Sequence, residues 1–198
     1  AALFASLGLG RLTVLQGITS GVENTNYYAG TERGQWVLTL FERLTRAELP
    51  YYLHLMRHLA AAGIPVLAPQ ARGTDGTGEL LHELAGKPAA VTTRLPGSHR
   101  LAPTPTHCVQ VGAMLARMHL AGASFAMQQP HLRGLAWWRE TVPAVLPHLQ
   151  GSQAGPAGQP GRAAQAALLQ EELRFHEQWA ASAAGQALPR GPIHADLF

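Results

Sequence analysis

Hydrophobic and polar positions change their period part-way along the chain, from the alternation of strands to the spacing of helices. In the first part, three runs rich in β-branched and aromatic residues are separated by glycines. These runs predict strands over 12–18, 25–31 and 35–41. Both alternating sides of the third run are mostly apolar, which predicts a strand covered on both faces. Further on, the stretch 78–97 predicts a hairpin that turns near Gly86–Lys87.

A first helix is predicted between these strands and the hairpin, where apolar residues recur at helical spacing over 49–60. Thr45 and Glu48 precede it at the spacing of a capping box. Pro50 fits that cap poorly, so we expect the helix to begin a few residues later.

The second part of the chain is predicted to be helical. Thr104 is expected to cap a helix with Pro105 at its first position, and Gly122 is expected to end it. Its apolar stripe consists of Cys108, Val111, Leu115 and Met118. Further helices are expected over 135–148 and 163–183.

These elements predict an α+β protein with two lobes. Residues 1–97 form a β-rich lobe, and residues 98–198 form a helical lobe. Within the second lobe, 150–162 is rich in turn-forming residues and has no apolar period, which predicts a flexible surface insertion.

Composition and charge narrow the class of partner. The chain has 198 residues, of which 46% are hydrophobic and 14% charged, so it can bury a sizeable core. A net charge of +3 suits a small anionic ligand. No basic run with interleaved aromatic residues is present, which argues against nucleic acid as the partner. No apolar run is long enough to span a bilayer, so no membrane partner is expected.

The chain has a single cysteine, so it cannot form an internal disulfide, which fits a reducing cytoplasm. We expect Cys108 to be a small buried apolar residue. The missing initiator methionine and the end at Phe198 lead us to expect a fragment cut at both ends.

The segment 17–28, GITSGVENTNYY, is the first candidate for chemistry. It links two predicted strands through two glycines and several small polar residues. Backbone N–H groups in such a turn can hold phosphate oxygens, because glycine permits close approach. The pattern is neither a G-x-G-x-x-G fingerprint nor a Walker A loop, and an ordinary hairpin turn explains it equally well.

Histidines and tryptophans supply the other candidates. Asp196 could act as a general base towards an alcohol with His194 positioning it, but a metal site or a structural role also fits the H-x-D pattern. His54 and His58 have the spacing of a zinc pair without a third ligand, so we expect a solvated helix face. Trp137 and its neighbour Trp138 fit either a ligand pocket or core packing.

In this order, the stretches resemble those of the aminoglycoside-phosphotransferase-like kinases and, within them, of the bacterial homoserine kinases. The matching stretches are GVENTNYY, WVLTLFERLTRAELPYYLHLMRHLAAAGIPVLAP, GKPAAVTTRLPG, HCVQVGAMLARMHLAG, LRGLAWWRE and LPRGPIHADLF. They cover nearly the whole chain except 150–162, and they are specific as a set. The resemblance implies a protein-kinase-like bilobal fold with an incomplete helical lobe. It also implies ATP-dependent phosphorylation of L-homoserine, a step in threonine biosynthesis.

The resemblance also implies roles for individual residues. Asp196 would accept the proton of the substrate hydroxyl, and His194 would shape the catalytic loop. The loop over 17–26 would cover the nucleotide phosphates, with Gly17, Gly21, Asn24 and Asn26 as its contact residues. The interlobe hinge, where backbone groups meet adenine, would be Thr93, Arg94 and Leu95. Independently of the resemblance, Arg133 and Arg139 are plausible partners for the carboxylate of the acceptor, and Trp137 is a candidate for its pocket, although the sequence does not show which side chains touch the acceptor.

Two departures from the family pattern affect these roles. The lysine that holds the α- and β-phosphates in the broader group falls on Thr39, so the cation must come from elsewhere, with Arg43 as one candidate. The family continues beyond Phe198 with an Asn and a second Asp that hold Mg²⁺, so we expect no metal ligand within this chain. We therefore expect the 198-residue chain to be inactive or nearly so.

Three alternatives remain open at this stage. The acceptor could be another alcohol, choline-like or an aminoglycoside, although the 12 acidic residues form no cluster for a polycation. The protein could instead be a non-catalytic nucleotide-binding pseudokinase. A metal-dependent hydrolase using His194 and Asp196 would need further ligands that no cluster offers. The sequence does not indicate an oligomeric state.

Overall fold

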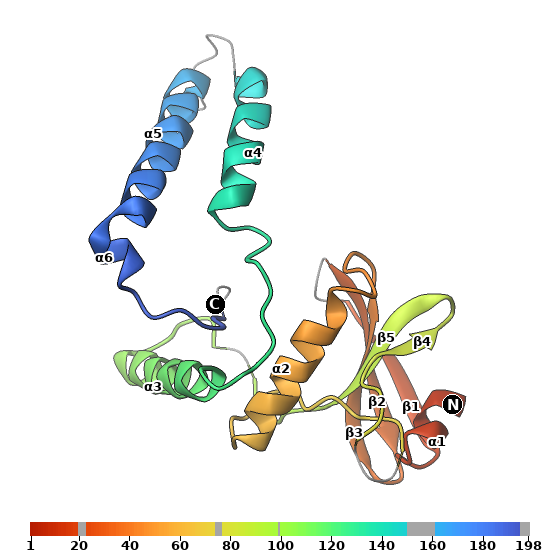
Figure 1. Cartoon of the computed structure of the whole chain (residues 1–198). Coiled ribbons are helices and arrows are strands. Elements are labelled where there is room, and N and C mark those ends of the chain that lie inside the picture. The colour runs from red at the N-terminus through yellow and green to blue at the C-terminus, as the bar shows by residue number, and fades with distance from the viewer. Residues whose placement is uncertain (20–22, 74–76, 99, 150–160, 195–198) are drawn as a thin grey trace. The chain divides into compact units, whose positions relative to one another are not determined.

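The computed structural model describes residues 1–19, 23–73, 77–98, 100–149 and 161–194 (Figure 1). The described residues form two compact units. One unit holds the residues from Ala1 to Met127 and from Gly191 onward, and the other holds Gln128 to Arg190. The boundaries of these units do not test the lobe boundary expected at residue 97, which stays a prediction.

The first unit is built on an antiparallel sheet of five strands in the order β1-β2-β3-β5-β4. The strands are β1 (Leu12–Ile18), β2 (Asn24–Thr31), β3 (Gly34–Phe41), β4 (His82–Leu84) and β5 (Lys87–Thr93). The three strands predicted from alternation are confirmed to within one residue at each end. The reason is that their β-branched and aromatic side chains fit a pleated surface that is covered on at least one side.

The hairpin between β4 and β5 turns one residue earlier than predicted. Leu84 pairs with Lys87, so the turn consists of Ala85 and Gly86. Both turn residues have positive φ, 53° for Ala85 and 73° for Gly86. Two-residue hairpin turns favour this geometry because it matches the twist of the strands, although it is unusual for alanine. Lys87 therefore already belongs to β5.

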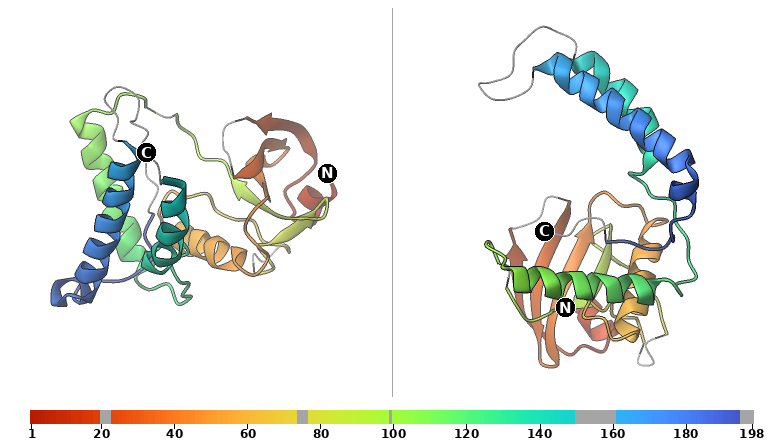
Figure 2. Two further views of the ribbon diagram at one scale, coloured as in Figure 1. Left: turned by 90° about the horizontal axis from the view of Figure 1, so that it is seen from above. Right: turned by 90° about the vertical axis from the view of Figure 1, so that its left-hand side faces the viewer.

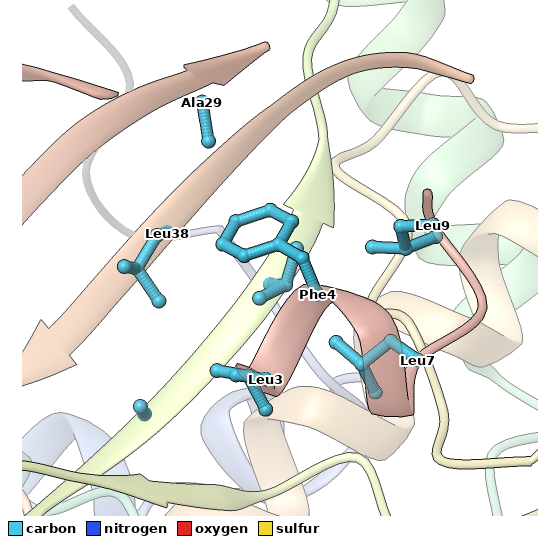
Figure 3. Close-up of a cluster of buried hydrophobic side chains, with 8 residues drawn as sticks. Leu3, Phe4, Leu7, Leu9, Ala29 and Leu38 are labelled. Atoms are coloured by element: carbon cyan, nitrogen blue, oxygen red, sulfur yellow. The ribbon is translucent and has the colours of Figure 1, made fainter. Parts of the chain in front are cut away.

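Two apolar clusters lie on opposite faces of the sheet, because alternate residues of β5 enter different clusters. On one face, helix α1 (Ala2–Ser6) packs on the sheet through a cluster of Leu3, Phe4, Leu7, Leu9, Ala29, Leu38, Ala89 and Val91 (Figure 3). On the other face, helix α2 (Leu49–Ala61) contributes Leu53 to a cluster with Leu80 and Ala90, against which Phe41 packs. The expected covering of both faces of β3 is confirmed at Leu38 and Phe41.

Helix α2 begins at Leu49, so the later start expected from Pro50 is wrong. The Glu48 carboxylate accepts hydrogen bonds from the Thr45 backbone N–H at 2.8 Å and the Thr45 hydroxyl at 2.7 Å. Pro50 lies in the first turn of the helix, where an N–H has no intrahelical partner, so its missing donor costs nothing. After the helix, Gly63 adopts a positive φ of 75°, which suits a helix C-terminus.

Helix α3 (Pro105–Gly122) confirms the predicted cap. The Thr104 hydroxyl accepts from the His107 N–H at 3.4 Å, and His107 Nδ1 accepts from the Thr104 N–H at 3.1 Å. The predicted burial of Cys108 is wrong, because this side chain is exposed, and Val111 is 46% exposed. The C-terminal end of α3 contacts the rest of its unit, where Pro192 packs near Gly122 and His58 of α2 meets the Ala121 carbonyl oxygen. The first turns of its apolar stripe therefore remain uncovered by the described residues.

The second unit is a pair of antiparallel helices (Figure 1, Figure 2). Its elements are α4 (Leu135–Val145), the 3-10 helix η1 (Leu146–Leu149), α5 (Arg162–Ala181) and α6 (Ala183–Gln186). Arg139 Nε lies 2.7 Å from Glu177 Oε1, and the Trp138 ring meets the His176 ring edge-to-face at 4.8 Å. Most of the predicted insertion over 150–162 lies outside the described residues, which end at 149 and resume at 161. Arg162 already belongs to α5, so the insertion ends before residue 162. No helix in the described part of the chain has the length and apolar character of a membrane span.

His82 on β4 is a buried histidine, with 2% of its surface exposed. Its Nε2 lies 3.1 Å from the Gln70 carbonyl oxygen, which can only accept, so Nε2 carries the proton. Nδ1 has no hydrogen-bond partner among the described residues. Burial lowers the pKa of His82, and the hydrogen bond to Gln70 opposes that shift only in part.

We expect stability to fall as the pH is lowered through about 6.5, where a histidine of the unfolded chain gains its proton but His82 in the fold does not. His54 adds to this loss in the same direction, because burial and Arg57 lower its pKa too. Urea unfolding at pH 7.5 and pH 5.5 measures the loss. His82→Gln, which retains an N–H for Gln70, should reduce it, whereas the exposed His148→Gln should not. An unchanged loss in His82→Gln would contradict this assignment.

Candidate functional site

Two rows of side chains cross the face of the sheet on which α2 packs, here called the α2-side face. Residues paired across antiparallel strands project to the same face, so the register fixes each row. The first, the aromatic row, consists of Gln16, Tyr28, Val37 and Thr92. The second, the amide row, consists of Ile18, Asn26, Thr39 and Ala90. An aromatic surface and a polar surface thus lie side by side on one face.

The amide row contains a defined polar pair. The Thr39 hydroxyl donates to Asn26 Oδ1 at 2.8 Å, and Asn26 Nδ2 lies 3.5 Å from the Asn24 carbonyl oxygen. The contact with the Asn24 carbonyl, which can only accept, favours an orientation of the amide with its nitrogen towards Asn24 and its oxygen towards β3. Asn26 and Thr39 are half-buried, so their side chains remain accessible to a ligand on this face.

The aromatic row ends near the exit of β5. The guanidinium carbon of Arg94 lies 4.3 Å from the centre of the Tyr28 ring, a cation–π geometry. Thr92 is 4% exposed, and its hydroxyl has no hydrogen-bond partner among the described residues. A planar group on this row would therefore meet an aromatic ring and a cation, whereas the Thr92 hydroxyl is buried beneath the surface.

The segment expected to act as a hinge has already used part of its hydrogen-bonding capacity. The Thr93 N–H donates to the Ala68 carbonyl at 3.0 Å, and the Arg94 N–H donates to the Gln35 carbonyl at 3.1 Å. Leu95 is 40% exposed, and no partner for its N–H is found in the described part of the chain. Among these three residues, Leu95 is the one whose amide is available to a ligand.

Cations near the rows are few. The only lysine of the chain, Lys87, contacts Glu42 at 2.6 Å, and the Thr25 hydroxyl donates to the same carboxyl group at 2.7 Å. The hydrogen bond from Lys87, followed by that from Thr25, lowers the pKa of Glu42. Arg43, the candidate cation, is exposed and makes no hydrogen bond or ion pair with the residues that the structure describes.

The expected phosphate loop is shorter than 17–26. Gly17 belongs to β1 and pairs with Tyr27, while Asn24 and Asn26 belong to β2. The antiparallel pairing of β1 with β2 extends to Ile18 and Asn26, so both ends of the expected loop lie within strands. Gly21 lies outside the described residues.

The other predicted site residues do not belong to the rows. His194 is exposed and Asp196 lies outside the described residues, so their joint role stays a prediction. Trp137 is 44% exposed, and Arg139 is paired with Glu177 within the second unit. The Arg133 backbone N–H donates to His131 Nδ1 at 3.1 Å. Their proximity to an acceptor also stays a prediction.

The solvated helix face expected for His54 and His58 is wrong for His58. Its Nε2 lies 2.9 Å from the Ala121 carbonyl oxygen, so it ties α2 to α3, and its ring lies 5.4 Å from that of Phe125. His54 Nδ1 contacts Arg57 at 2.9 Å. Within the described ranges, no three His, Cys, Asp or Glu side chains gather as a metal site.

The sequence did not indicate that Tyr28 and Thr92 lie on one face of the sheet. The signal was available in part, because Tyr28 lies two residues after Asn26 and Val37 lies two residues before Thr39. Residues two apart in a strand share a face. The register that unites the strands into rows was not available from the sequence.

Together, the antiparallel sheet, its two-row face and the helical segments define an α+β protein of the kinase-like class. Two solved structures share this fold. A spectinomycin phosphotransferase in complex with ADP and spectinomycin superposes with a TM-score of 0.60 and 16% identity, over 99% of this chain and 62% of that one. An amicoumacin kinase in complex with AMP-PNP, Ca²⁺ and amicoumacin superposes with a TM-score of 0.59 and 19% identity, over 92% of this chain and 53% of that one. The fold class predicted from the sequence is confirmed.

Residues 14–198 match the model of the phosphotransferase enzyme family, and the chain belongs to that family. A homoserine kinase of Polaromonas naphthalenivorans is 54% identical over 198 residues, which is 100% of this chain and 58% of that protein. One of Paraburkholderia xenovorans is 51% identical over 190 residues, which is 96% of this chain and 53% of that protein. The chain thus spans just over half the length of these curated relatives.

Proposed function

We propose that the protein is an ATP-dependent kinase that phosphorylates the hydroxyl group of L-homoserine to give O-phospho-L-homoserine, as in threonine biosynthesis. The observation that carries this proposal is the identity of 54% to a homoserine kinase along the entire chain. Its partners are ATP and a small amino-acid alcohol. The single cysteine, exposed and without a disulfide, suits a cytoplasmic protein.

The two-row face supports a nucleotide as the first substrate. Adenine is proposed to lie along the aromatic row, with its edge at Leu95 and its plane near Tyr28 and Arg94. The phosphate chain is proposed to run over the amide row towards the turn between β1 and β2. Successive residues on one face of a strand are about 7 Å apart, so the rows separate an aromatic group from an anionic one by a distance suited to a nucleotide.

The chemistry proposed is direct transfer. Asp196 accepts the proton of the homoserine hydroxyl while the oxygen attacks the γ-phosphorus. A new P–O bond forms to the acceptor, the bond to the β,γ-bridging oxygen breaks, and ADP leaves. His194 is proposed to shape the loop that carries Asp196. The nucleotide is taken as its Mg²⁺ complex, in which the ion neutralises phosphate charge.

Acceptor recognition is proposed for the region of Arg133, Trp137 and Arg139. An arginine can hold a carboxylate with two parallel hydrogen bonds, which suits the amino-acid end of homoserine. Arg139 would have to exchange its contact with Glu177 for the substrate carboxylate.

The test is ADP release from MgATP by the protein at its natural full length, with L-homoserine, choline or kanamycin as the acceptor. We expect turnover with L-homoserine alone, with kcat on the order of 1–100 s⁻¹. Faster turnover with choline or kanamycin would show that L-homoserine is not the acceptor. Nucleotide binding without any turnover would replace the kinase with a non-catalytic binding module.

A further inference from the structure

The first turn of α3 is closed by a histidine at a position where capping boxes usually have glutamate or glutamine. The Thr104 backbone N–H donates to His107 Nδ1 at 3.1 Å, and the His107 N–H donates to the Thr104 hydroxyl at 3.4 Å. The Thr104 hydroxyl also lies 3.2 Å from the same Nδ1. The imidazole thus supplies the acceptor that a carboxylate or an amide side chain supplies in other capping boxes.

These contacts fix the protonation state of the imidazole. A backbone N–H can only donate, so Nδ1 of His107 must hold a lone pair, and the ring is neutral with its hydrogen on Nε2. A protonated ring carries hydrogens on both nitrogens, which would set two donors against each other. Histidine is the side chain whose charge changes between about pH 5 and 8, whereas a glutamine keeps its acceptor throughout that range.

The surroundings of His107 also disfavour a cation. The residue lies in the first turn of α3, where the unpaired N–H groups of a helix carry a partial positive charge. The stretch 94–122 contains no Asp or Glu, and its charged residues are Arg94, Arg100 and Arg117. No ion pair joins His107 to a side chain in the part of the chain that the structure describes.

The element that packs on α3 does not reach its first turn. Helix α2 meets α3 at the opposite end, where His58 lies 2.9 Å from the Ala121 carbonyl oxygen. On α3 itself, the other groups that can titrate are Cys108, which follows directly in the chain, and His119. His119 lies about 18 Å further along the helix axis, at a rise of about 1.5 Å per residue. The state of the first turn therefore depends on the contacts between Thr104 and His107.

We propose that His107 makes the start of α3 sensitive to pH: the neutral imidazole closes the first turn, and protonation of the imidazole opens it. The cap fixes the residue at which the connection from β5 ends and α3 begins. Opening the turn lengthens this connection at the expense of the helix. The inference is independent of the proposed function, because it depends only on contacts within one helical turn.

Amide hydrogen exchange, followed by mass spectrometry on the protein at its natural full length, tests the inference. Protection of the first turn, residues 104–109, is divided by protection of residues 113–120 of the same helix. This ratio is compared at pH 7.5 and pH 5.5, after correction for intrinsic exchange rates. We expect the ratio to fall about 3-fold to 10-fold at pH 5.5, the effect of losing a helix cap. A general loss of stability, such as that expected from His82, lowers both terms and leaves the ratio unchanged.

Three variants assign the effect to the imidazole. His107→Gln keeps an acceptor that does not titrate, so its ratio should stay within about 2-fold between the two pH values. His107→Ala has no acceptor, so its first turn should be poorly protected at both. His119→Gln, in the last turn of the same helix, is the matched control and should retain the pH dependence of the parent.

The position of the ring hydrogen is a second readout. Nitrogen-15 NMR of the parent at pH 7.5, with the His107 signal identified by its absence in His107→Gln, should show a hydrogen on Nε2 alone. A hydrogen on Nδ1 at this pH contradicts the cap and overturns the inference. A parent ratio that does not change with pH, or an equal fall in His107→Gln, overturns it as well.

Discussion

Asp196→Asn is expected to abolish nearly all homoserine-dependent ADP formation, with a fall in kcat of about 100-fold to 10,000-fold. Asparagine has almost the shape of aspartate, but its amide cannot accept the proton that the homoserine hydroxyl loses. The acceptor oxygen would then attack while still protonated. The measurement is kcat with saturating MgATP and L-homoserine, on the protein at its natural full length.

The control is Asp75→Asn, because Asp75 is the only other aspartate of the chain. It has no proposed role, so kcat should stay within about 2-fold of the parent. ADP binding should persist in Asp196→Asn, since the base does not hold the adenine ring. A variant that keeps more than about a tenth of the parent kcat would exclude Asp196 as the base.

Phe4→Ala is expected to produce the largest loss of stability, about 3–5 kcal/mol in the free energy of unfolding. Phe4 is 2% exposed and lies between α1 and the sheet, in contact range of the cluster that includes Leu38 and Val91 (Figure 3). Removing the ring takes away buried apolar surface and leaves a cavity that the surrounding strands cannot fill. Urea unfolding measures the difference.

Phe175→Ala is the matched control, because the same side chain on α5 is 56% exposed. Its cost should stay below about 0.5 kcal/mol. If Phe4→Ala does not fold well enough to measure, Phe4→Leu, which retains most of the apolar volume, should show a smaller loss in the same direction. A cost for Phe4→Ala below about 1 kcal/mol would contradict the role of this cluster as the core of the sheet unit.

Local patterns in the sequence predicted the strands and the cap of α3. The alternation over 35–41 depends only on the pleat of a strand, and the cap at Thr104 depends only on residues within one turn. The family followed from a set of stretches along the chain, and the match over residues 14–198 confirms it. The start of α2 was mispredicted because Pro50 disfavours a helix interior but is well suited to a first turn.

Burial and pairing between distant residues could not be predicted in the same way. Cys108 lies on an apolar stripe, but nothing in that stripe shows whether another element covers its first turns. His58 lies on the polar side of its own helix, and its partner is the Ala121 carbonyl oxygen, 63 residues away. Helical spacing specifies a face of a helix, and it does not specify what that face meets.

For this protein, the sequence alone determined the class of fold, the three N-terminal strands, the longer helices and the family to which the chain belongs, because each depends on local pattern or on likeness along the chain. It did not predict the short helix α1. Only the tertiary structure decided that Asn26 and Thr39 share a hydrogen bond and that Arg94 covers Tyr28. The physical reason is strand register, since pairing β1, β2, β3 and β5 places residues from separate segments in one row. A shift of one residue in any strand would turn its side chains to the opposite face, and these contacts would not form.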